Sequence, residues 1–373
     1  ILYSDMSCNA NMVASKTPIG VVFDVTNGLA IAKDEFANLV WGAVVEDVSG
    51  VQNSSSVSTS TADWQGFKNT KAMYEADKSG VNYPAIKKVL TYSTTGTEQG
   101  QWYLPAAGEL QAISTNKDTL NTTLAKIGGT QMSGNYWSSS EQNSGSSYYI
   151  GIGNNSSSTG RKIAKNKAKP VINFVNKNKV DVAYVSSNET TCKIGSILYS
   201  DKKCYAGSAP SGKTPIGIVF DASRRTAIAL ESSPSTMYWS TEYVGIPGIT
   251  NTDSSKAKQD FNGKANTAAI KARNSSLSNY PAAKYAYNYT TTGTNVGEWY
   301  LPALGELNTA YSNKDFLNYA LSLVGKKDIP TDYYHWSSSE YSYSDAWNLR
   351  FSDGGVFRYF KNNDYYVRPV LAF

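Results

Sequence analysis

The chain contains one long internal repeat, and this repeat restricts the possible folds more than any other feature of the sequence. The motif WYLPA occupies residues 102–106 and again residues 299–303, an offset of 197 residues. Repeats of solenoid proteins are about 20–50 residues long, so this period is far too long for a solenoid. The sequence therefore predicts two globular domains of one fold. Three further motifs recur in the same order: ILYSD (1–5 and 197–201), KTPIG (16–20 and 213–217) and WSSSE (137–141 and 336–340).

The repeat also sets the domain boundaries. A chain of 373 residues is long enough for two domains that each bury a core. We expect domains at residues 1–175 and 196–373, joined by a linker at residues 176–195. The linker contains a polar Ser-Ser-Asn-Glu-Thr-Thr stretch, which is typical of loops. Apolar residues alternate between residues 180 and 184, and these could instead form a short edge strand.

Each domain is expected to have an α+β architecture. Gly20–Asp24 and Leu29–Lys33 are apolar runs on either side of an Asn-Gly turn, which predicts a β-hairpin. The spacing of apolar residues predicts a helix over Thr61–Lys78, and Pro105 is expected in the first turn of a second helix. Only short strands and loops are expected after it, up to a terminal strand that closes the domain. The corresponding features of the second copy are the helix Ser255–Ala272 and Pro302.

The charge and the histidine content disfavour several classes of function. The 35 basic and 30 acidic residues leave a net charge of +5, which is scattered along the chain, so we expect no nucleic-acid partner. The densest basic run, from Lys162 to Lys169, is interpreted as a solvated strand or loop edge. His335 is the single histidine, which disfavours both a histidine metal site and a Ser-His-Asp triad. We therefore expect no metal, no cofactor and no enzymatic activity.

The three cysteines predict one disulfide. Cys192 and Cys204 flank the second copy of ILYSD, so a bond between them would hold the entry strand of the second domain. Cys8 corresponds to Cys204, and we expect it to be unpaired because its partner would precede Ile1. Three free buried thiols are the alternative. If the disulfide forms, the protein works in an oxidising compartment outside the cytosol.

The C-terminal segment, Tyr333–Phe373, contains two kinds of position. Trp336 and Trp347 are expected in the core, because the first copy has an aromatic residue at both places. Glu340 is expected to accept hydrogen bonds from loop amides. Between these positions lie clusters of Tyr, Ser, Asp and Asn, a mixture that is typical of antibody combining sites. Because so many tyrosines cannot all be buried, we predict that they form a ligand-binding surface.

Three motifs in the chain resemble a known family. The WYLP…GEL sequence, the WSSSE motif and the terminal VRPVLAF resemble the C-type-lectin-like domains in variable proteins of diversity-generating retroelements. They are also similar to bacterial surface domains such as the C-terminal domain of the Legionella collagen-like adhesin. The resemblance covers both copies and is strongest over residues 298–373. It implies two tandem C-type-lectin-like domains, each with a β-hairpin, two helices and a loop-rich β region closed by the C-terminal strand.

The resemblance also implies which positions vary. Randomisation in this family is implied to act at adenines, and Asn codons changed in this way cannot encode Trp, Glu, Lys, Gln or Met. Residues of these excluded types, such as Trp336, Glu340 and Lys361, fall at expected framework positions. The positions implied to form the variable, ligand-binding face are Tyr333, Tyr334, His335, Tyr341, Tyr343, Asp345, Asn348, Arg350, Ser352, Asp353, Phe357, Arg358, Tyr359, Phe360, Asn362, Asn363, Asp364 and Tyr365.

A similar helix start occurs in formylglycine-generating enzymes, which share the C-type lectin fold class. Their chemistry is implied to need paired cysteines in the C-terminal region, and here no cysteine follows Cys204. The sequence therefore favours binding over catalysis.

The leading hypothesis is a variable ligand-binding protein displayed outside the cell, on a cell or virion surface. Its C-terminal domain would bind an unidentified protein or glycan. The first domain is interpreted as a spacer or stalk, because its matching segment, Tyr136–Phe174, is rich in Ser, Gly and Asn. An adhesin with fixed specificity for one glycan or host protein is the alternative. Membrane attachment is expected only through an anchor upstream of Ile1.

Overall fold

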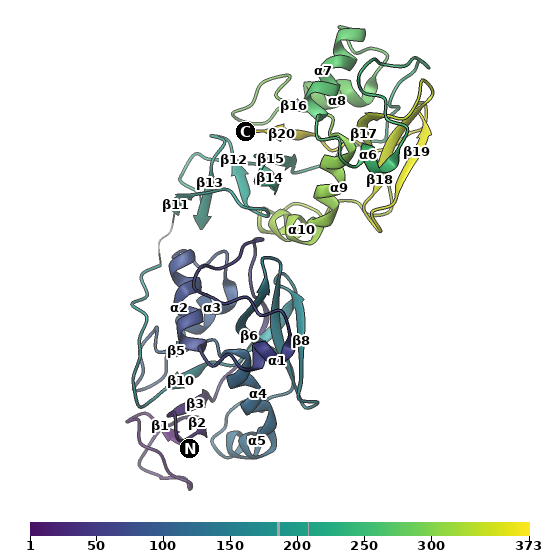
Figure 1. Ribbon diagram of the computed structural model, residues 1–373. Helices are drawn as coiled ribbons and strands as arrows, with labels where there is room; N and C mark the ends of the chain where they lie inside the picture. The colour runs from purple at the N-terminus through teal and green to yellow at the C-terminus, as the bar shows by residue number, and fades with distance from the viewer. Residues whose placement is uncertain (185–186, 208) are drawn as a thin grey trace. The chain divides into compact units, whose positions relative to one another are not determined.

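The computed structural model describes residues 1–184, 187–207 and 209–373 and divides into two compact units, Ile1–Asn188 and Glu189–Phe373 (Figure 1). Both units combine helices with β-sheets, so the predicted α+β class is confirmed. In these described residues, no helix is both long and apolar enough to cross a membrane.

The predicted linker, residues 176–195, packs in part on the first unit. Val180 is buried, and its amide donates a hydrogen bond to the carbonyl of Gly100. The ring of Tyr184 lies 5.5 Å from the ring of Tyr74. This stretch is therefore attached by side-chain packing and does not form the edge strand that was considered. The linker prediction also includes residues 185 and 186, which lie outside the described residues.

In the first unit, the hairpin and the terminal strand lie in one sheet. Strands β2 (Pro18–Asp24) and β3 (Leu29–Ala32) pair antiparallel, as the sequence predicts. The terminal strand β10 (Val171–Asn173) lies between β3 and β5 (Trp102–Tyr103) and so closes the unit. The same sheet includes β1 (Leu2–Tyr3), and a second sheet has the order β4 (Phe36–Val40), β9 (Lys165–Ala168), β6 (Gly134–Asn143), β7 (Ser146–Ile152) and β8 (Ser156–Arg161).

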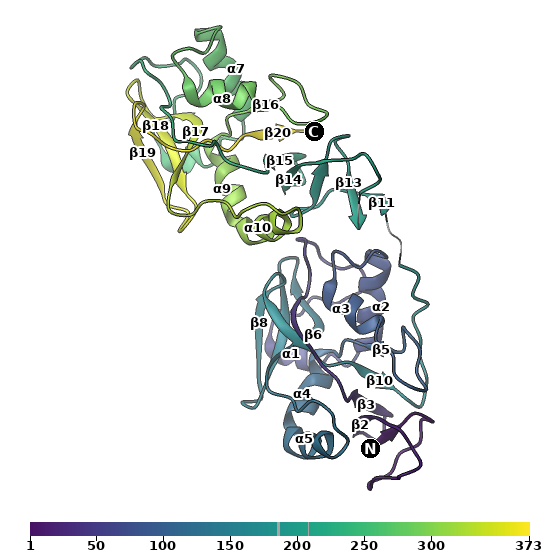
Figure 2. The same ribbon diagram turned by 180° about the vertical axis from the view of Figure 1, so that it is seen from behind.

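The second unit repeats this arrangement. Its terminal strand β20 (Val370–Ala372) lies between β15 (Thr226–Ala229) and β16 (Trp299–Tyr300). The same sheet continues through β14 (Pro215–Asp221), β12 (Ile197–Tyr199), β13 (Cys204–Gly207) and β11 (Ser187–Thr190). A separate three-stranded sheet has the order β17 (Tyr334–Glu340), β18 (Asp345–Arg350) and β19 (Val356–Phe360), with β19 at its edge (Figure 2).

The helices differ from the prediction. The predicted helix Thr61–Lys78 is shortened to α2 (Gly66–Ala76), and the single helix predicted after Pro105 is divided into α4 (Ala107–Thr115) and α5 (Lys117–Lys126). Among the described residues each unit has five short helices, so the prediction of two is wrong. The others are α1 (Val57–Thr61) and α3 (Pro84–Leu90) in the first unit, and α6 (Ser254–Ala257), α7 (Gly263–Arg273), α8 (Pro281–Asn288), α9 (Leu304–Ser312) and α10 (Lys314–Leu323) in the second.

The start of α9 differs from the prediction. Its first turn is held by a glutamate side chain, and the proline expected in that turn lies before the helix. Pro302 precedes the N-cap residue Ala303 and is not itself helical. The buried carboxylate of Glu306 accepts hydrogen bonds from the amide of Ala303 at 2.7 Å and from the hydroxyl of Tyr300 at 3.0 Å. An acceptor at this place satisfies a free helix N–H group and complements the helix dipole. Glu109 holds the start of α4 in the same way.

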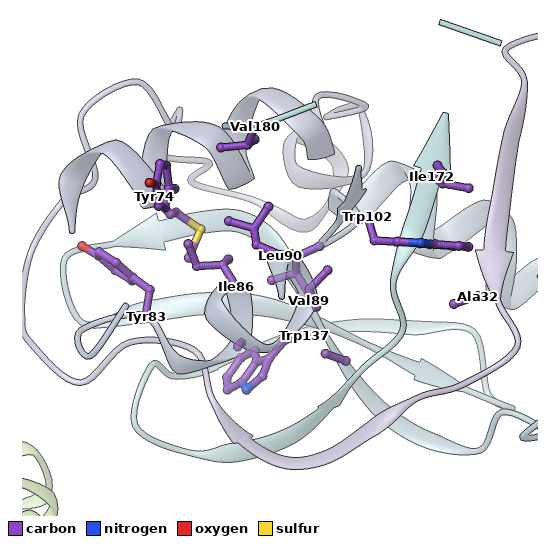
Figure 3. Packing of buried hydrophobic residues seen from close by; sticks show 14 of the residues in the cluster. Ala32, Tyr74, Tyr83, Ile86, Val89, Leu90, Trp102, Trp137, Ile172 and Val180 are labelled. Atoms are coloured by element: carbon purple, nitrogen blue, oxygen red, sulfur yellow. The ribbon is translucent and has the colours of Figure 1, made fainter. Parts of the chain in front are cut away.

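The core of the first unit is built around tryptophans from the repeated motifs. Figure 3 shows Trp102 and Trp137 buried together with Ile86, Val89 and Leu90 of α3. Each of these side chains is fully buried, and burying one large apolar side chain contributes about 1.5–3 kcal/mol. The tryptophans of WYLPA and WSSSE therefore belong to the framework of the fold.

The basic run from Lys162 to Lys169 is not a solvated edge, which corrects the prediction. Lys162 and Lys169 are both fully buried, whereas Lys165 and Lys167 on β9 are exposed or half-buried. The ammonium of Lys162 bonds the carboxylate of Glu141 and the carbonyl of Glu46. A buried cation is tolerated when it is paired and hydrogen-bonded, and sequence spacing alone does not reveal such partners.

Candidate binding surface

The three-stranded sheet β17–β18–β19 carries most of the positions that the sequence predicts to bind ligand. Residues opposite each other in antiparallel strands point to the same side of the sheet. Tyr334 pairs with Arg350, and Ala346 pairs with Tyr359. Phe357 lies opposite Asn348, which is two residues from Arg350 and therefore on the same side. With Tyr365 from the loop after β19, the side chains of Tyr334, Arg350, Phe357 and Tyr359 form one surface, which we call the aromatic face.

The rings of the aromatic face contact one another. The Tyr334 ring lies 5.3 Å from Phe357, 5.3 Å from Tyr359 and 5.0 Å from Tyr365. The guanidinium of Arg350 lies 5.3 Å from the centre of the Phe357 ring and 5.7 Å from that of Tyr334. All five side chains are half-buried, so they support one another and still present area to solvent. Aromatic contacts of this kind are worth about 0.5–1.5 kcal/mol each beyond the area that they bury.

An ion pair holds the turn beside the aromatic face. Arg350 donates two hydrogen bonds to the carboxylate of Asp353, at 3.1 and 2.5 Å. The same carboxylate accepts the amide of Gly355 at 2.9 Å. These contacts lower the pKa of Asp353 to about 2, and the hydrogen bonds from Arg350 contribute most. Gly354 has a positive φ of 71°, which suits glycine in the turn between β18 and β19.

The predicted positions do not all share one side of the sheet. Arg358 points to the side opposite the aromatic face, where its guanidinium lies 4.2 Å from the centre of the Tyr341 ring. Tyr341 in turn packs on Trp347 at 5.3 Å. Phe360 and Tyr343 are among the most exposed large side chains, at 57% and 66%. The candidate surface therefore continues from the aromatic face around the edge strand β19.

Most of the remaining predicted positions are accessible. Two of the eighteen, His335 and Asn348, are buried and are excluded from the surface, which corrects the prediction. The exposed positions are Tyr333, Tyr343, Ser352, Asp353, Arg358, Phe360, Asn362 and Asp364, and the half-buried ones are Tyr334, Tyr341, Asp345, Arg350, Phe357, Tyr359, Asn363 and Tyr365.

His335 is buried because it lies on the side of β17 that faces the core. Its ring lies 5.1 Å from the ring of Phe351, and its Nε2 lies 3.3 Å from the hydroxyl of Ser232. Burial, with a smaller contribution from the charge of Arg368, lowers the pKa of His335 to about 3. The imidazole is therefore neutral at physiological pH and cannot act as a charged ligand contact.

Asn348 is buried on the central strand, beneath the aromatic face. It lies opposite Trp336 on one neighbouring strand and Phe357 on the other. Neither its amide nitrogen nor its amide oxygen has a hydrogen-bond partner among the described residues. An unpartnered buried amide costs about 1–3 kcal/mol.

We therefore expect Asn348→Leu to raise the unfolding free energy of the second unit by about 1 kcal/mol, because Leu has a similar volume and leaves no polar group unsatisfied. Urea denaturation of the whole chain measures the effect. Asn348→Asp is the matched control and should destabilise the unit, since it buries a charge. A loss of stability in Asn348→Leu would show that the amide has a partner.

A buried ion pair joins the end of β17 to the residue that follows β19. Lys361 Nζ lies 2.5 Å from Glu340 Oε1, and both side chains are fully buried. Glu340 also accepts the amide of Ile246 at 3.0 Å and the hydroxyl of Thr250 at 2.5 Å. Its predicted role as an acceptor of loop amides is thus observed. The ammonium of Lys361 further donates to the carbonyl of Val244 at 2.8 Å, and burial lowers the pKa of this lysine.

The serines of WSSSE connect β17 to its neighbours. Ser337 Oγ donates to the carbonyl of Trp347 at 2.8 Å. Ser339 Oγ donates to Asp260 at 2.7 Å and accepts the amide of Leu304, at the start of α9, at 3.0 Å. Small hydroxyl side chains suit these places because they satisfy buried polar groups in a space that holds little else.

The two predicted core tryptophans are buried, and each anchors a loop. Trp336 Nε1 donates to the carbonyl of Met237 at 2.9 Å, and Trp347 Nε1 donates to that of Asn251 at 2.7 Å. Sequence reasoning missed a third one, Trp239, whose ring centre lies 4.7 Å from Lys361 Nζ. The signal for it was present, because the first unit has Trp41 beside Lys162 at the same distance.

The first unit has the same sheet without the aromatic face. Trp137 pairs with Tyr149 and Tyr149 with Ser158, as Trp336 pairs with Asn348 and Asn348 with Phe357. In this segment the two copies therefore match residue by residue at an offset of 199. At this offset the counterparts of Tyr334, Arg350, Phe357, Tyr359 and Tyr365 are Asn135, Gly151, Ser158, Gly160 and Asn166.

Cys192 and Cys204 are joined by a disulfide, with their Cα atoms 5.3 Å apart. Cys204 is buried on β13 and pairs with Leu198 of β12, so the bond ties the entry strand as the sequence predicts. Cys8 is exposed and free. In the described residues, no group of three or more His, Cys, Asp or Glu side chains is placed to hold a metal ion.

No protein-family model and no curated protein sequence matches the chain. Among solved structures, a fimbrial protein from Bacteroides ovatus is similar with 16% sequence identity and a TM-score of 0.39. The similarity covers 61% of this chain and 56% of that one, less than two thirds of its length. A TM-score this low carries no argument about fold or function.

Proposed function

We propose that the second unit binds a ligand through the aromatic face and the adjoining edge of β19. The observation that carries this proposal is the comparison of the two copies. Both have the same sheet register and the same buried Glu–Lys pair, so the fold does not require the aromatic side chains. The second unit nevertheless has five large contacting side chains where the first has Asn, Gly and Ser.

The chemistry of the surface suits recognition of a macromolecule. Tyrosine provides a large rigid area with a polar hydroxyl, and Ser and Asn around it provide adaptable hydrogen bonds. Arg350 and Arg358 add donors that can pair with acidic groups or stack on rings. Tyr343 and Phe360 add two large side chains that are mostly exposed to solvent. We propose binding to a protein or glycan, and no catalytic role.

The finer proposal is a variable protein with two C-type-lectin-like domains. It is supported by the placement of the motifs that carry the resemblance, since Trp336, the three serines, Glu340 and Arg368 are all buried framework. Sixteen of the eighteen positions implied to vary are at least partly accessible. We further propose that the first unit acts as a spacer and that the protein is displayed on a cell or virion surface.

Sequencing the gene in sister isolates tests the proposal. We expect codon differences concentrated at the accessible positions of residues 333–365, with Trp336, Glu340 and Lys361 unchanged. A neighbouring reverse-transcriptase gene and a template copy that differs only at adenines should accompany them. The first unit's matching segment, residues 134–166, is the internal control and should not vary. An invariant C-terminal segment would contradict the variable-protein proposal and would leave an adhesin of fixed specificity.

A further inference from the structure

A cavity in the second unit has a different chemistry from the aromatic face. It has a volume of about 520 Å³, and its walls include Ser232, Lys326, Lys327, Tyr333, Tyr366 and Arg368. The rings of Tyr333 and Tyr366, both in its lining, lie 5.1 Å apart. Only Tyr333 is shared with the predicted binding positions, so the cavity is a separate feature of the unit.

Arg368 is a buried cation at the wall of this cavity. Its side chain is 1% exposed, and burial lowers its pKa to about 10. Nε donates to the carbonyl of Ala229 at 2.9 Å, Nη2 to that of Leu230 at 2.7 Å, and Nη1 to the hydroxyl of Ser232 at 3.4 Å. Among the residues that the structure describes, no carboxylate forms an ion pair with it. A guanidinium has five N–H groups, so two of them have no acceptor in these contacts.

The equivalent buried cation of the first unit lies beside a glutamate. Lys169 occupies the place of Arg368 and is equally buried. Beside it lies Glu35, whose carboxylate pairs with Lys167 at 2.8 Å and accepts the hydroxyl of Tyr136. The charge of Glu35 acts on Lys169 and partly offsets the cost of burying that ammonium.

Each of these partners is changed in the second unit. At the same positions Glu35 is replaced by Ser232, Tyr136 by His335 and Lys167 by Tyr366. Ser232 has no carboxylate, and it lines the cavity. The charge of Glu231 also acts on Arg368, but this carboxylate pairs with Lys326 at 2.7 Å on the surface. The second unit therefore retains the buried cation without the glutamate that accompanies it in the first unit.

We propose that this cavity binds the carboxylate of an external ligand, which takes the place of the lost glutamate. The two free N–H groups on Nη1 and Nη2 of Arg368 point to a bidentate contact, the usual geometry of Arg with carboxylates. Ser232 donates a further hydrogen bond, and Lys326 and Lys327 add positive charge at the rim. The paired rings of Tyr333 and Tyr366 favour a flat or apolar body attached to the acid. The ligand class is thus a small organic carboxylate, either a peptide C-terminus or an acidic sugar.

Titration of the full chain with benzoate, and with benzamide as the uncharged analogue, tests this proposal by NMR. We expect saturable shifts with benzoate and at least tenfold weaker binding of benzamide. N-acetyltyrosine and glucuronate then identify the source of the carboxylate by which of them binds more tightly.

Two variants locate the site. Ser232→Glu restores the carboxylate found in the first unit and is expected to weaken benzoate binding at least tenfold. Arg368→Lys installs the first unit's cation, which cannot form a bidentate contact, and should weaken it similarly. Ser254→Glu, at an exposed position outside the cavity, makes the same charge change as Ser232→Glu and should bind like the unmodified chain. The proposal is overturned if benzoate gives no saturable shift, or if Ser232→Glu binds it as tightly as the unmodified chain.

Discussion

Replacing Lys361 with Met is expected to destabilise the second unit by about 3–5 kcal/mol, because it leaves the carboxylate of Glu340 buried without a countercharge. The ammonium of Lys361 is fully buried, lies 2.5 Å from Glu340 and also donates to the carbonyl of Val244. Hydrogen exchange resolved by peptide measures the effect in the full chain. Amides of β17, β18 and β19 should lose protection, whereas those of β6 and β7 in the first unit should keep theirs.

The repeat provides a matched control for this experiment. Lys162→Met breaks the equivalent pair with Glu141 and should reverse the pattern, so that only the first unit loses protection. The double variant Lys361→Met with Glu340→Gln should recover part of the loss, because Gln carries no charge and its oxygen can still accept the amide of Ile246. If Lys361→Met lowers the unfolding free energy of the second unit by less than about 1 kcal/mol, the pair does not stabilise the unit as claimed.

Raising the pH from about 4.5 to about 7 is expected to destabilise the second unit through Glu306. Burial raises the pKa of this carboxyl from 4.5 to about 7 in the folded chain. Between these two values the folded state keeps a proton that the unfolded state has lost, so the stability contributed by Glu306 is complete below pH 4.5 and is lost as the pH rises to about 7. The shift corresponds to about 3 kcal/mol.

Urea denaturation at a series of pH values, compared between the unmodified chain and Glu306→Gln, isolates this contribution. The glutamine cannot ionise, so the variant should gain about 3 kcal/mol relative to the unmodified chain between acidic and mildly alkaline pH. Glu109→Gln should give the same result in the first unit. Because the pKa of Glu109 is raised to about 8, its stabilising contribution is lost over a range that extends to about pH 8. Curves that stay parallel across this range would show that Glu306 is ionised in the fold at all of these pH values.

The elements that the sequence predicts well are those with both a local pattern and a second copy. The hairpin β2–β3 has an Asn-Gly turn between apolar runs, and its equivalent recurs after KTPIG. The helices were predicted less well because their ends depend on contacts from distant residues. Asn116 lies between α4 and α5, and its side-chain amide donates a hydrogen bond to the carbonyl of Ala112. An asparagine in a helical pattern does not by itself predict such a break.

The candidate surface was predicted from composition and from the family resemblance, and neither can tell which residues of a strand are covered. Asn348 and His335 have the same types of neighbours in the sequence as the exposed residues. His335 is buried because its side of β17 faces the core beside Phe351, and Asn348 is buried because it lies on the central strand β18 between Trp336 and Phe357. The loop that contains Met237 and Trp239 packs nearby, against Trp336 and Lys361.

The ion pair beneath the surface could have been predicted from the repeat. Glu141 and Lys162 are 21 residues apart, and so are Glu340 and Lys361. Lys162 was instead interpreted, from its basic neighbours, as part of a solvated run. A charged residue that is retained in both copies at a fixed spacing from an opposite charge indicates a buried pair more strongly than local charge density indicates exposure.

The central claim is that the fold and the binding surface of the second unit are separable, and a pair of displayed libraries tests it most directly. One library of the full chain randomises the aromatic face, Tyr334, Arg350, Phe357, Tyr359 and Tyr365, and the other randomises the buried framework positions Trp336, Ser337, Glu340, Trp347 and Lys361. The measurement is the fraction of clones that resist protease. The first unit has the same sheet register with Asn, Gly and Ser at these places, so most members of the first library should stay resistant and most of the second should not. Equal loss of resistance in both libraries would contradict the claim.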